Sequence, residues 1–378
     1  MLKKLLCATI FTMLISCFCI SARALYVSAD CAVLLESGSG QVVFSKNPDK
    51  KSAMASTTKI MTALLAIERN EPDSVVLMTD EMVRVEGSCM GLKAGDMMTV
   101  EDLLHGLMLQ SGNDAANALA VHTGKSQSEF VSMMNRRAGE LGLANTGFET
   151  PSGLDGDGHY STALDMAKLG VFAMKNKIFA GIVSKKTAQV TFLNSDLKVT
   201  YSNHNRLLRE YDGTVGIKTG FTKKAGRCLV SAAERDGVLL VAATLDAPDD
   251  WNDHKRMFDY GFSLYKSYAL DTSLPVESIP LISGEKNSLA VEVIEPLAVA
   301  LANPDEPAAL KKVIELPKFE YAGIKKGQPV GKIRFYLNNE PVASADITAA
   351  EDIPEIAVTE PPQKSFFDHI GDFFGWMF

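Results

Sequence analysis

Candidate strands lie at both ends of one long segment of this chain, with candidate helices between them, and this order constrains the fold most. Near the start, apolar Cys31–Leu35 and Gln41–Phe44 flank Glu36-Ser37-Gly38-Ser39-Gly40 and predict a β-hairpin. Three more apolar runs of strand length close the segment: Val215–Thr219, Cys228–Ala233 and Val238–Leu245. The last two are joined by turn residues at Arg235-Asp236-Gly237. We therefore expect an antiparallel sheet closed by both ends of the segment, in an α/β (α+β) fold.

Apolar periodicity between these strands predicts a cluster of helices. One helix follows Ser56, and its apolar residues recur at the spacing of a buried face. A second starts at the capping pattern Thr99-Val100-Glu101-Asp102 and stops at Ser111-Gly112-Asn113. Further helices are expected at Ala115–His122, Phe130–Leu141 and Trp251–Tyr265. The loop 151–159 is rich in Gly and Asp, and the mainly polar stretch from there to about Asn205 is assigned no element.

Beyond about Asp271 the character of the sequence changes. Short alternating runs are bounded by Pro and Gly, and Asn338-Asn339 is a candidate turn between two of them. The runs are Leu289–Ile294, Val313–Leu316, Ile333–Leu337 and Val342–Ile347. They predict a small all-β C-terminal domain over residues 269–353, after a first domain over 25–268.

The first 24 residues have the pattern of a secretory signal peptide. Lys3 and Lys4 precede the apolar stretch 5–20, and Ala22-Arg23-Ala24 is a small-x-small cleavage site. An apolar run of about 16 residues is short for a membrane span, which needs about 20. Leu14-Ile15-Ser16-Cys17 also resembles a lipoprotein box, which leaves a lipidated Cys17 as an alternative. Either way we expect export to the extracytoplasmic face of a bacterial membrane.

The C-terminal end predicts contact with a membrane surface. Residues 354–364 contain three prolines and read as a stiff linker. The last stretch, 365–378, places seven large apolar residues on one helical arc: Phe366, Phe367, Ile370, Phe373, Phe374, Met377 and Phe378. About 14 residues are too few to span a bilayer, so we expect an amphipathic anchor lying in the interface. The alternative is a helix docked on the protein body, because the polar face lacks Lys and Arg.

Charge and cysteine content exclude several classes. The formal net charge is −8, and cleavage after Ala24 removes three cations and no acids, which leaves −11. Nucleic acid is therefore not an expected partner, because binding it needs a basic surface. The mature cysteines would be Cys31, Cys89 and Cys228, an odd number without a metal-knuckle spacing, and the six histidines show no ligand-spaced pair. We expect no metal and no cofactor.

The first element with chemical meaning is Ser56-Thr57-Thr58-Lys59. Residues three apart on a helix share a face, so the Lys59 amine can reach the Ser56 hydroxyl. A serine needs a base to become a nucleophile, and a lysine acts as that base only when it is neutral. The spacing alone is not specific, because it recurs at Ser195, Ser263 and Ser283. Ser56 stands out because it follows a hairpin and opens a buried helix.

Two further elements follow in order along the chain. Ser111-Gly112-Asn113 lies between two helices, where the hydroxyl can relay a proton and the amide can hold a substrate. Lys218-Thr219-Gly220 ends a strand, where Lys and Thr can bind a carboxylate and Gly220 admits a close backbone. Each triplet alone is better explained as a turn or a strand exit. All three together, each on the expected type of element, are poorly explained by chance.

The set resembles the S-x-x-K, S-D-N and K-T-G motifs of class A β-lactamases and penicillin-binding proteins. With Gly112 in the middle triplet, it is similar to the S-G-N of D-alanyl-D-alanine carboxypeptidases. Thr150-Pro151-Ser152-Gly153-Leu154 and His159-Tyr160-Ser161-Thr162-Ala163 resemble that family's N-P-x-G-L and H-Y-S-T-A segments, with Thr150 in place of Asn. The likeness spans residues 26–265, the β-rich region 270–355 and the terminal anchor.

This resemblance implies a serine-transpeptidase/β-lactamase-like domain and an exported carboxypeptidase. Such an enzyme removes the terminal D-alanine from peptidoglycan stem pentapeptides through an acyl-enzyme, and β-lactam antibiotics inhibit it covalently. Ser56 would be the nucleophile, Lys59 its proton acceptor, and Ser111 with Asn113 would complete the relay. Lys218 and Thr219 would bind the terminal carboxylate beside Gly220. The backbone N–H groups of Ser56 and Phe221 would form the oxyanion hole.

Two alternatives remain open at this level. A class A-like β-lactamase clears its acyl-enzyme with a glutamate-held water and an E-x-x-L-N pattern, whereas Glu140-Leu141-Gly142-Leu143-Ala144-Asn145 has one residue too many. A non-catalytic penicillin-binding cell-wall scaffold would keep the pocket without turnover. Release of D-alanine from a peptide that ends in D-Ala-D-Ala separates an enzyme from such a scaffold.

Overall fold

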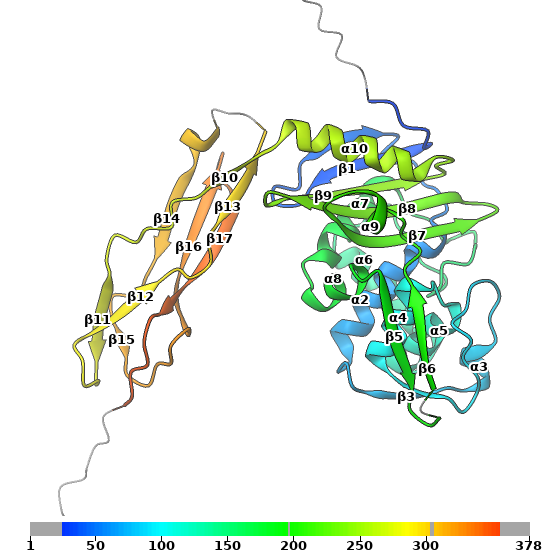
Figure 1. Cartoon of the computed structure of the whole chain (residues 1–378), viewed down its shortest axis with the longest axis horizontal. Coiled ribbons are helices and arrows are strands. Elements are labelled where there is room, and N and C mark those ends of the chain that lie inside the picture. Colours follow the sequence, from blue (N-terminus) through cyan, green and yellow to red (C-terminus); the bar gives the residue numbers. More distant parts are fainter. Residues whose placement is uncertain (1–24, 196, 303–305, 356–378) are drawn as a thin grey trace, which may run out of the picture. The chain divides into compact units, whose positions relative to one another are not determined.

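The computed structural model describes residues 25–195, 197–302 and 306–355. The chain divides into two compact units, with the boundary in the sequence between Lys266 and Ser267 (Figure 1). The predicted signal peptide with Cys17, the linker beyond Glu355 and the predicted anchor 365–378 lie outside the described residues. No helix within the described ranges combines the length and hydrophobicity needed to cross a membrane.

The first unit is built on a five-stranded antiparallel sheet. Its strands are β1 (Cys31–Glu36), β2 (Val42–Lys46), β7 (Thr214–Thr222), β8 (Gly226–Arg235) and β9 (Val238–Leu245). They are ordered β2-β1-β9-β8-β7, and Cys31 pairs with Leu245, so the two ends of the segment do close one sheet. Asp236 and Gly237 have φ of 50° and 76°, which two-residue hairpin turns require. The predicted α/β (α+β) fold class is confirmed.

Helices cover both faces of this sheet. In α7 (Ala163–Met174), Gly170 packs against Val241 and Val230, whereas in α10 (Asp250–Leu264), Gly261 packs against Leu240 and Leu34. Consecutive strand residues point to opposite faces, so these two helices lie on opposite sides of the sheet (Figure 1).

A helical cluster lies on the α7 side of the sheet. A 3-10 turn η2 (Ala55–Thr58) leads into α2 (Lys59–Arg69), followed by α3 (Asp80–Val83), α4 (Val100–Leu109), α5 (Asn113–Gly124) and α6 (Gln127–Glu140). The predicted cap at Thr99 is present, because its hydroxyl accepts a hydrogen bond from Asp102 N at 3.1 Å. Within this part of the chain, β3 (Val75–Leu77) and β4 (Met97–Thr99) pair with each other as a short antiparallel ribbon.

The stretch before Asn205, to which the sequence assigned no element, is structured. It holds α7, α8 (Lys177–Val183) and a hairpin of β5 (Thr187–Phe192) and β6 (Leu197–Ser202), and α9 (Leu207–Glu210) follows. Much of the buried face of α7 is Ala and Gly, so its periodicity is weak, although the Thr162 hydroxyl caps the helix by accepting from Asp165 N.

The second unit is an all-β domain, as predicted. Its six-stranded sheet is ordered β14-β16-β17-β12-β11-β15, and β10 (Lys266–Ala269) pairs with β13 (Ala298–Leu301) apart from it. The six strands are β11 (Ser278–Ile282), β12 (Ser288–Glu292), β14 (Lys311–Glu315), β15 (Glu320–Tyr321), β16 (Pro329–Leu337) and β17 (Glu340–Ala349), and a 3-10 turn η3 spans Glu306–Ala309. Asn338 and Asn339, with φ of 53° and 68°, form the expected β16–β17 turn.

Candidate active site

One cleft in the first unit is lined by residues from all three predicted motifs. Ser56 comes from η2, Ser111 from the α4–α5 connection, and Thr219 and Gly220 from β7. The rest of its lining is Ser88, His204, Phe221, Arg227, Asp250 and Trp251. The fold thus brings three segments that are distant in sequence to one opening.

Lys59 is completely buried, and its amine has three oxygen partners. Its Nζ lies 2.9 Å from Ser56 Oγ, 2.7 Å from Asn113 Oδ1 and 2.5 Å from the Ser152 carbonyl oxygen. The side chain of Asn113 is oriented by its amide nitrogen, which donates to the Glu86 carbonyl at 2.5 Å, so Oδ1 is left to face Lys59. Burying an amine is costly unless every hydrogen is used.

These partners have a consequence for the proton on Lys59. A carbonyl and an amide oxygen only accept, so they take both hydrogens of a neutral amine. The nitrogen lone pair then faces Ser56 Oγ, which can give its own hydrogen to it. The arrangement can therefore hold a neutral Lys59 that removes the proton from Ser56, and also the ammonium formed by that transfer, which donates to all three oxygens.

Electrostatics favour the neutral form of Lys59. Complete burial, and next the positive charge of Lys218, lower the pKa of Lys59 well below its usual 10.5, and Asp114 only partly opposes this. Burial also lowers the pKa of Lys218, to about 7. Two buried amines near each other disfavour a second positive charge.

The structure places the other predicted residues unequally. Ser111 lines the cleft in a left-handed backbone conformation, φ 63°, but its hydroxyl makes no hydrogen bond to any residue described here. Lys218 does not line the cleft: it is 1% exposed and donates to the Thr219 carbonyl at 2.9 Å. Phe221 is 65% exposed at the cleft rim.

Gly220 is where β7 passes the nucleophile. A Cβ at this position would lie 3.0 Å from Ser56 N and 3.1 Å from Thr57 N, tighter than ordinary contacts. A glycine therefore lets the strand edge and the start of η2 approach each other.

Arg227 is a cleft residue that the sequence analysis did not identify. It lies opposite Phe221 in the β7–β8 register, and its Nε donates to Asp250 Oδ1 at 2.9 Å. Its guanidinium carbon is 5.6 Å from the centre of the Trp251 ring. Both terminal Nη groups stay without a hydrogen bond among the described residues, so they can bind an anion in the cleft.

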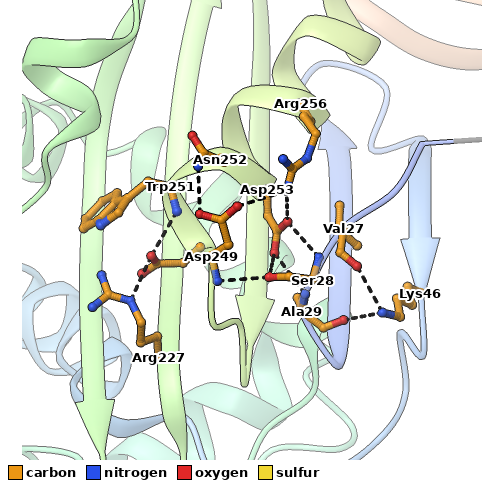
Figure 2. A network of polar contacts seen from close by, with 11 residues as sticks. Val27, Ser28, Ala29, Lys46, Arg227, Asp249, Trp251, Asn252, Asp253 and Arg256 are labelled. Carbon is orange, nitrogen blue, oxygen red and sulfur yellow. Dashed lines mark hydrogen bonds and ion pairs between the residues drawn. The ribbon is translucent and has the colours of Figure 1, made fainter.

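The partner of Arg227 is held by the first turn of α10. Asp250 is 2% exposed, and burial raises the pKa of its carboxyl. Three residues on, Asp253 accepts hydrogen bonds from Ser28 N, Ser28 Oγ and Ala29 N at 2.7–2.9 Å, which ties the start of the described chain to this turn. Figure 2 shows Arg227 and Trp251 at one end of this network, Ser28 near its middle and Lys46 at the other end. Only the register of β7 and β8 could have revealed Arg227.

Two known protein families match this chain, and both are consistent with the site described above. Residues 19–249 match the D-alanyl-D-alanine carboxypeptidase family, and residues 262–355 match the C-terminal domain of penicillin-binding protein 5. The chain belongs to the D-alanyl-D-alanine carboxypeptidase family of penicillin-binding serine peptidases.

Relatives of this carboxypeptidase extend over most of its length. It is 33% identical over 336 residues to D-alanyl-D-alanine carboxypeptidase DacF of Bacillus subtilis, with 86% of each chain covered. It is 32% identical over 368 residues to DacC of Escherichia coli, with 92% of this chain and 88% of the relative covered. Penicillin-binding protein 5 of Haemophilus influenzae superposes with a TM-score of 0.62 at 28% identity, over 87% of this chain and 98% of that one.

The expected activity is therefore confirmed: the protein is a serine-type D-alanyl-D-alanine carboxypeptidase, a hydrolase of the penicillin-binding class. Because the family acts on peptidoglycan, the carboxypeptidase works outside the cytoplasm. Within the described residues no group of three His, Cys, Asp or Glu is placed to hold a metal ion.

Proposed function

We propose that Ser56 is the acyl-ester nucleophile of this carboxypeptidase and that neutral Lys59 is its base. The observation that carries this assignment is the set of three oxygen partners around Lys59 Nζ, two of which only accept hydrogen bonds. As Ser56 Oγ attacks the carbonyl carbon of the penultimate D-alanine, its proton passes to Lys59. The negative charge that develops on the substrate oxygen is stabilised by the backbone N–H groups of Ser56 and Phe221.

The remaining steps return the protons. The C–N bond to the terminal D-alanine breaks, and the leaving amine takes a proton from Lys59 through the Ser111 hydroxyl. This hydroxyl lines the cleft and has no hydrogen bond to another residue in the described part of the chain. Water then attacks the Ser56 ester carbon and gives its proton to Lys59. The ester C–O bond breaks, Ser56 Oγ recovers the proton, and the shortened peptide leaves. Asn113 holds Lys59 in place throughout.

Thr219 and Arg227 bind the terminal carboxylate of the stem peptide, and Lys218 adds positive charge from behind. Thr219 and Arg227 line the cleft, and the Nη groups of Arg227 are available for a two-point contact. Lys218 is buried with its Nζ turned to the Thr219 carbonyl, so it acts mainly through its field.

A glutamate-assisted lactamase mechanism has no support in this cleft. Glu140 is bound to Arg137 at 2.9 Å and is absent from the cleft lining. Among the described residues that line the cleft, the one carboxylate is Asp250, and it is bound to Arg227 Nε at 2.9 Å. We therefore expect penicillin to acylate Ser56 and leave slowly.

We further propose that residues 1–24 direct export and that 365–378 hold the enzyme on the outer face of the membrane. Support comes from the sequence pattern: a cationic start with an apolar stretch at one end, and seven large apolar residues on one arc at the other.

The decisive experiment is mass spectrometry of the mature protein after treatment with penicillin, combined with measurement of D-alanine released from a peptide ending in D-Ala-D-Ala. A penicilloyl adduct on Ser56, and loss of both activities in Ser56→Ala, are expected. An adduct on another residue, or equal D-alanine release by Ser56→Ala, would refute the assignment. An adduct on Ser56 without turnover would instead identify a scaffold.

A further inference from the structure

The peptide bond between Ala55 and Ser56 carries two polar groups. Its N–H belongs to Ser56 and is an oxyanion donor in the proposed mechanism, and its carbonyl belongs to Ala55. Because a trans peptide is planar, the carbonyl points away from the N–H, and fixing one fixes the other. Ser56 N–H has no hydrogen-bond partner among the residues that the structure describes, so it is free to meet a substrate oxygen.

A directional chain of hydrogen bonds ends on the Ala55 carbonyl. Glu149 N–H donates to His159 Nδ1 at 3.0 Å, and this requires an unprotonated Nδ1. The neutral ring then carries its hydrogen on Nε2, which lies 2.8 Å from Thr58 Oγ1 and donates to it. The Thr58 hydroxyl hydrogen goes to the Ala55 carbonyl, also at 2.8 Å.

This chain is buried and reaches a strained backbone position. His159, Thr58 and Ala55 are each at most 3% exposed. Burial lowers the pKa of His159 to about 4, so its ring stays neutral near pH 7. Ala55 has φ of 48°, a conformation that a residue other than glycine keeps only when its surroundings enforce it.

We propose that His159 is a positioning residue that acts through Thr58 on the Ala55–Ser56 peptide and aims the Ser56 N–H at the oxyanion. The inference rests on the proposed roles of Ser56 and its N–H. A carbonyl that accepts a hydrogen bond polarises its peptide, so the N–H of the same peptide becomes a stronger donor. His159 itself touches no substrate.

Thr58→Val is the sharpest test, because it keeps the shape of the side chain and removes the hydroxyl that joins His159 to Ala55. Thr62→Val is the matched control: Thr62 lies one turn further along α2, is equally buried, and its hydroxyl donates to the Pro151 carbonyl at 2.6 Å. Thr58→Ser restores the hydroxyl and should recover the wild-type rate.

We expect Thr58→Val to slow both acylation and deacylation by about tenfold to a hundredfold, because each step passes through an oxyanion. The dissociation constant of the initial complex should change little. A β-lactam with sulfur in place of its carbonyl oxygen adds a specific readout, since sulfur accepts hydrogen bonds poorly. The preference for the oxygen compound should shrink in Thr58→Val and stay at the wild-type value in Thr62→Val.

His159→Phe should have the same effect, and the double variant with Thr58→Val should be no slower than the worse single variant, because the two residues act in one chain. Equal rates in Thr58→Val and Thr62→Val, or a loss confined to one of the two steps, would overturn the proposal. Failure of the proposed function has a different signature, because the wild-type protein itself would then carry no adduct on Ser56.

Discussion

The carbonyl oxygen of Ser152 lies 2.5 Å from the amine of Lys59, and this backbone group completes the surroundings of the base. It belongs to the loop that contains Gly153, and Gly153 packs against the backbone of Ala55, the residue before the nucleophile. The loop thus supports both the base and the peptide before Ser56.

Gly153→Ala should abolish most of the acylation. Gly153 has φ of +89°, and a Cβ there would lie 2.6 Å from the Ala55 carbonyl carbon and 2.9 Å from Thr58 Oγ1. The loop or η2 must therefore move, and a displacement of about 1 Å at reacting atoms costs about a hundredfold in rate. Stopped-flow fluorescence with a fluorescent penicillin measures the acylation rate of the variant.

Gly142→Ala is the control for that variant. Gly142 has φ of +68°, but no atom of the described residues lies within 4 Å of an added Cβ. The substitution therefore brings the same kind of backbone strain without a collision at the site. It should lower stability by about 1–2 kcal/mol and leave acylation near the wild-type rate. Equal acylation defects in the two variants would mean that strain, and not the contact with Ala55, is responsible.

Lys218→Met should move the pH dependence of acylation. Acylation needs neutral Lys59, so its rate rises with pH through the pKa of Lys59. The charge on Lys218 lowers that pKa, and removing the charge must raise it. The rising limb of the acylation rate is therefore expected at higher pH in the variant. A limb that stays in place or moves to lower pH would contradict the coupling.

Arg227→Gln should weaken recognition of substrates that have a free terminal carboxylate. We expect kcat/KM for a peptide ending in D-Ala-D-Ala to fall about tenfold to a hundredfold, since a two-point charged contact is replaced by a neutral one. For the same peptide with a C-terminal amide, kcat/KM should fall much less, because this peptide has no carboxylate for Arg227 to bind.

Arg206→Gln supplies the matched control for Arg227. Arg206 also stacks on Trp251, with its guanidinium carbon 5.7 Å from the ring centre, but it is absent from the cleft lining. Arg206→Gln should leave kcat/KM for both peptides nearly unchanged. If Arg227→Gln lowered hydrolysis of the acid and the amide by the same factor, its role would be structural and Thr219 with Lys218 would carry the recognition.

The sequence predicts the parts of this site that are local and misses those that depend on tertiary contacts. Ser56 and Lys59 are three residues apart on one helical face, so their contact follows from helix geometry. Ser152 contributes a backbone carbonyl, which no side-chain pattern identifies. Arg227 reaches the cleft only because β8 pairs with β7 in a particular register.

The same contrast holds for the fold. The five strands of the first unit's main sheet, and β12, β14, β16 and β17 of the second unit, alternate or run apolar and were predicted to within a few residues. The other strands, β3, β4, β5, β6, β10, β11, β13 and β15, were not predicted. Helix α7 was not predicted either, because it buries mainly small residues against the sheet. In α7, a Cβ at Gly170 would lie only 2.9 Å from Val241 Cγ1, so the helix packs closely on the sheet. It therefore lacks the periodic large apolar residues by which a helix is recognised in a sequence. Predicting that helix requires knowing the sheet beneath it.

Stability should fall as the solution becomes acidic, because of a buried histidine in α10. His254 is fully buried between Ser231 and Thr244, and this burial lowers its pKa to about 3. In the unfolded chain its pKa is near 6.5. Between these values the unfolded state binds a proton that the native state does not. The free energy of unfolding therefore falls as pH decreases from 6.5 toward 3, by up to about 1.4 kcal/mol per unit.

Urea denaturation of the wild type and of His254→Gln from pH 8 to pH 4 tests this prediction. Glutamine keeps polar atoms near Ser231 and Thr244 but does not titrate. The variant should be less stable at pH 8, because it fits the site less well, and its stability should depend less steeply on pH below 6.5. His159, with a pKa of about 4, contributes in the same direction in both proteins and leaves a shared residual slope. Parallel stability curves for the two proteins would show that His254 is not the group responsible.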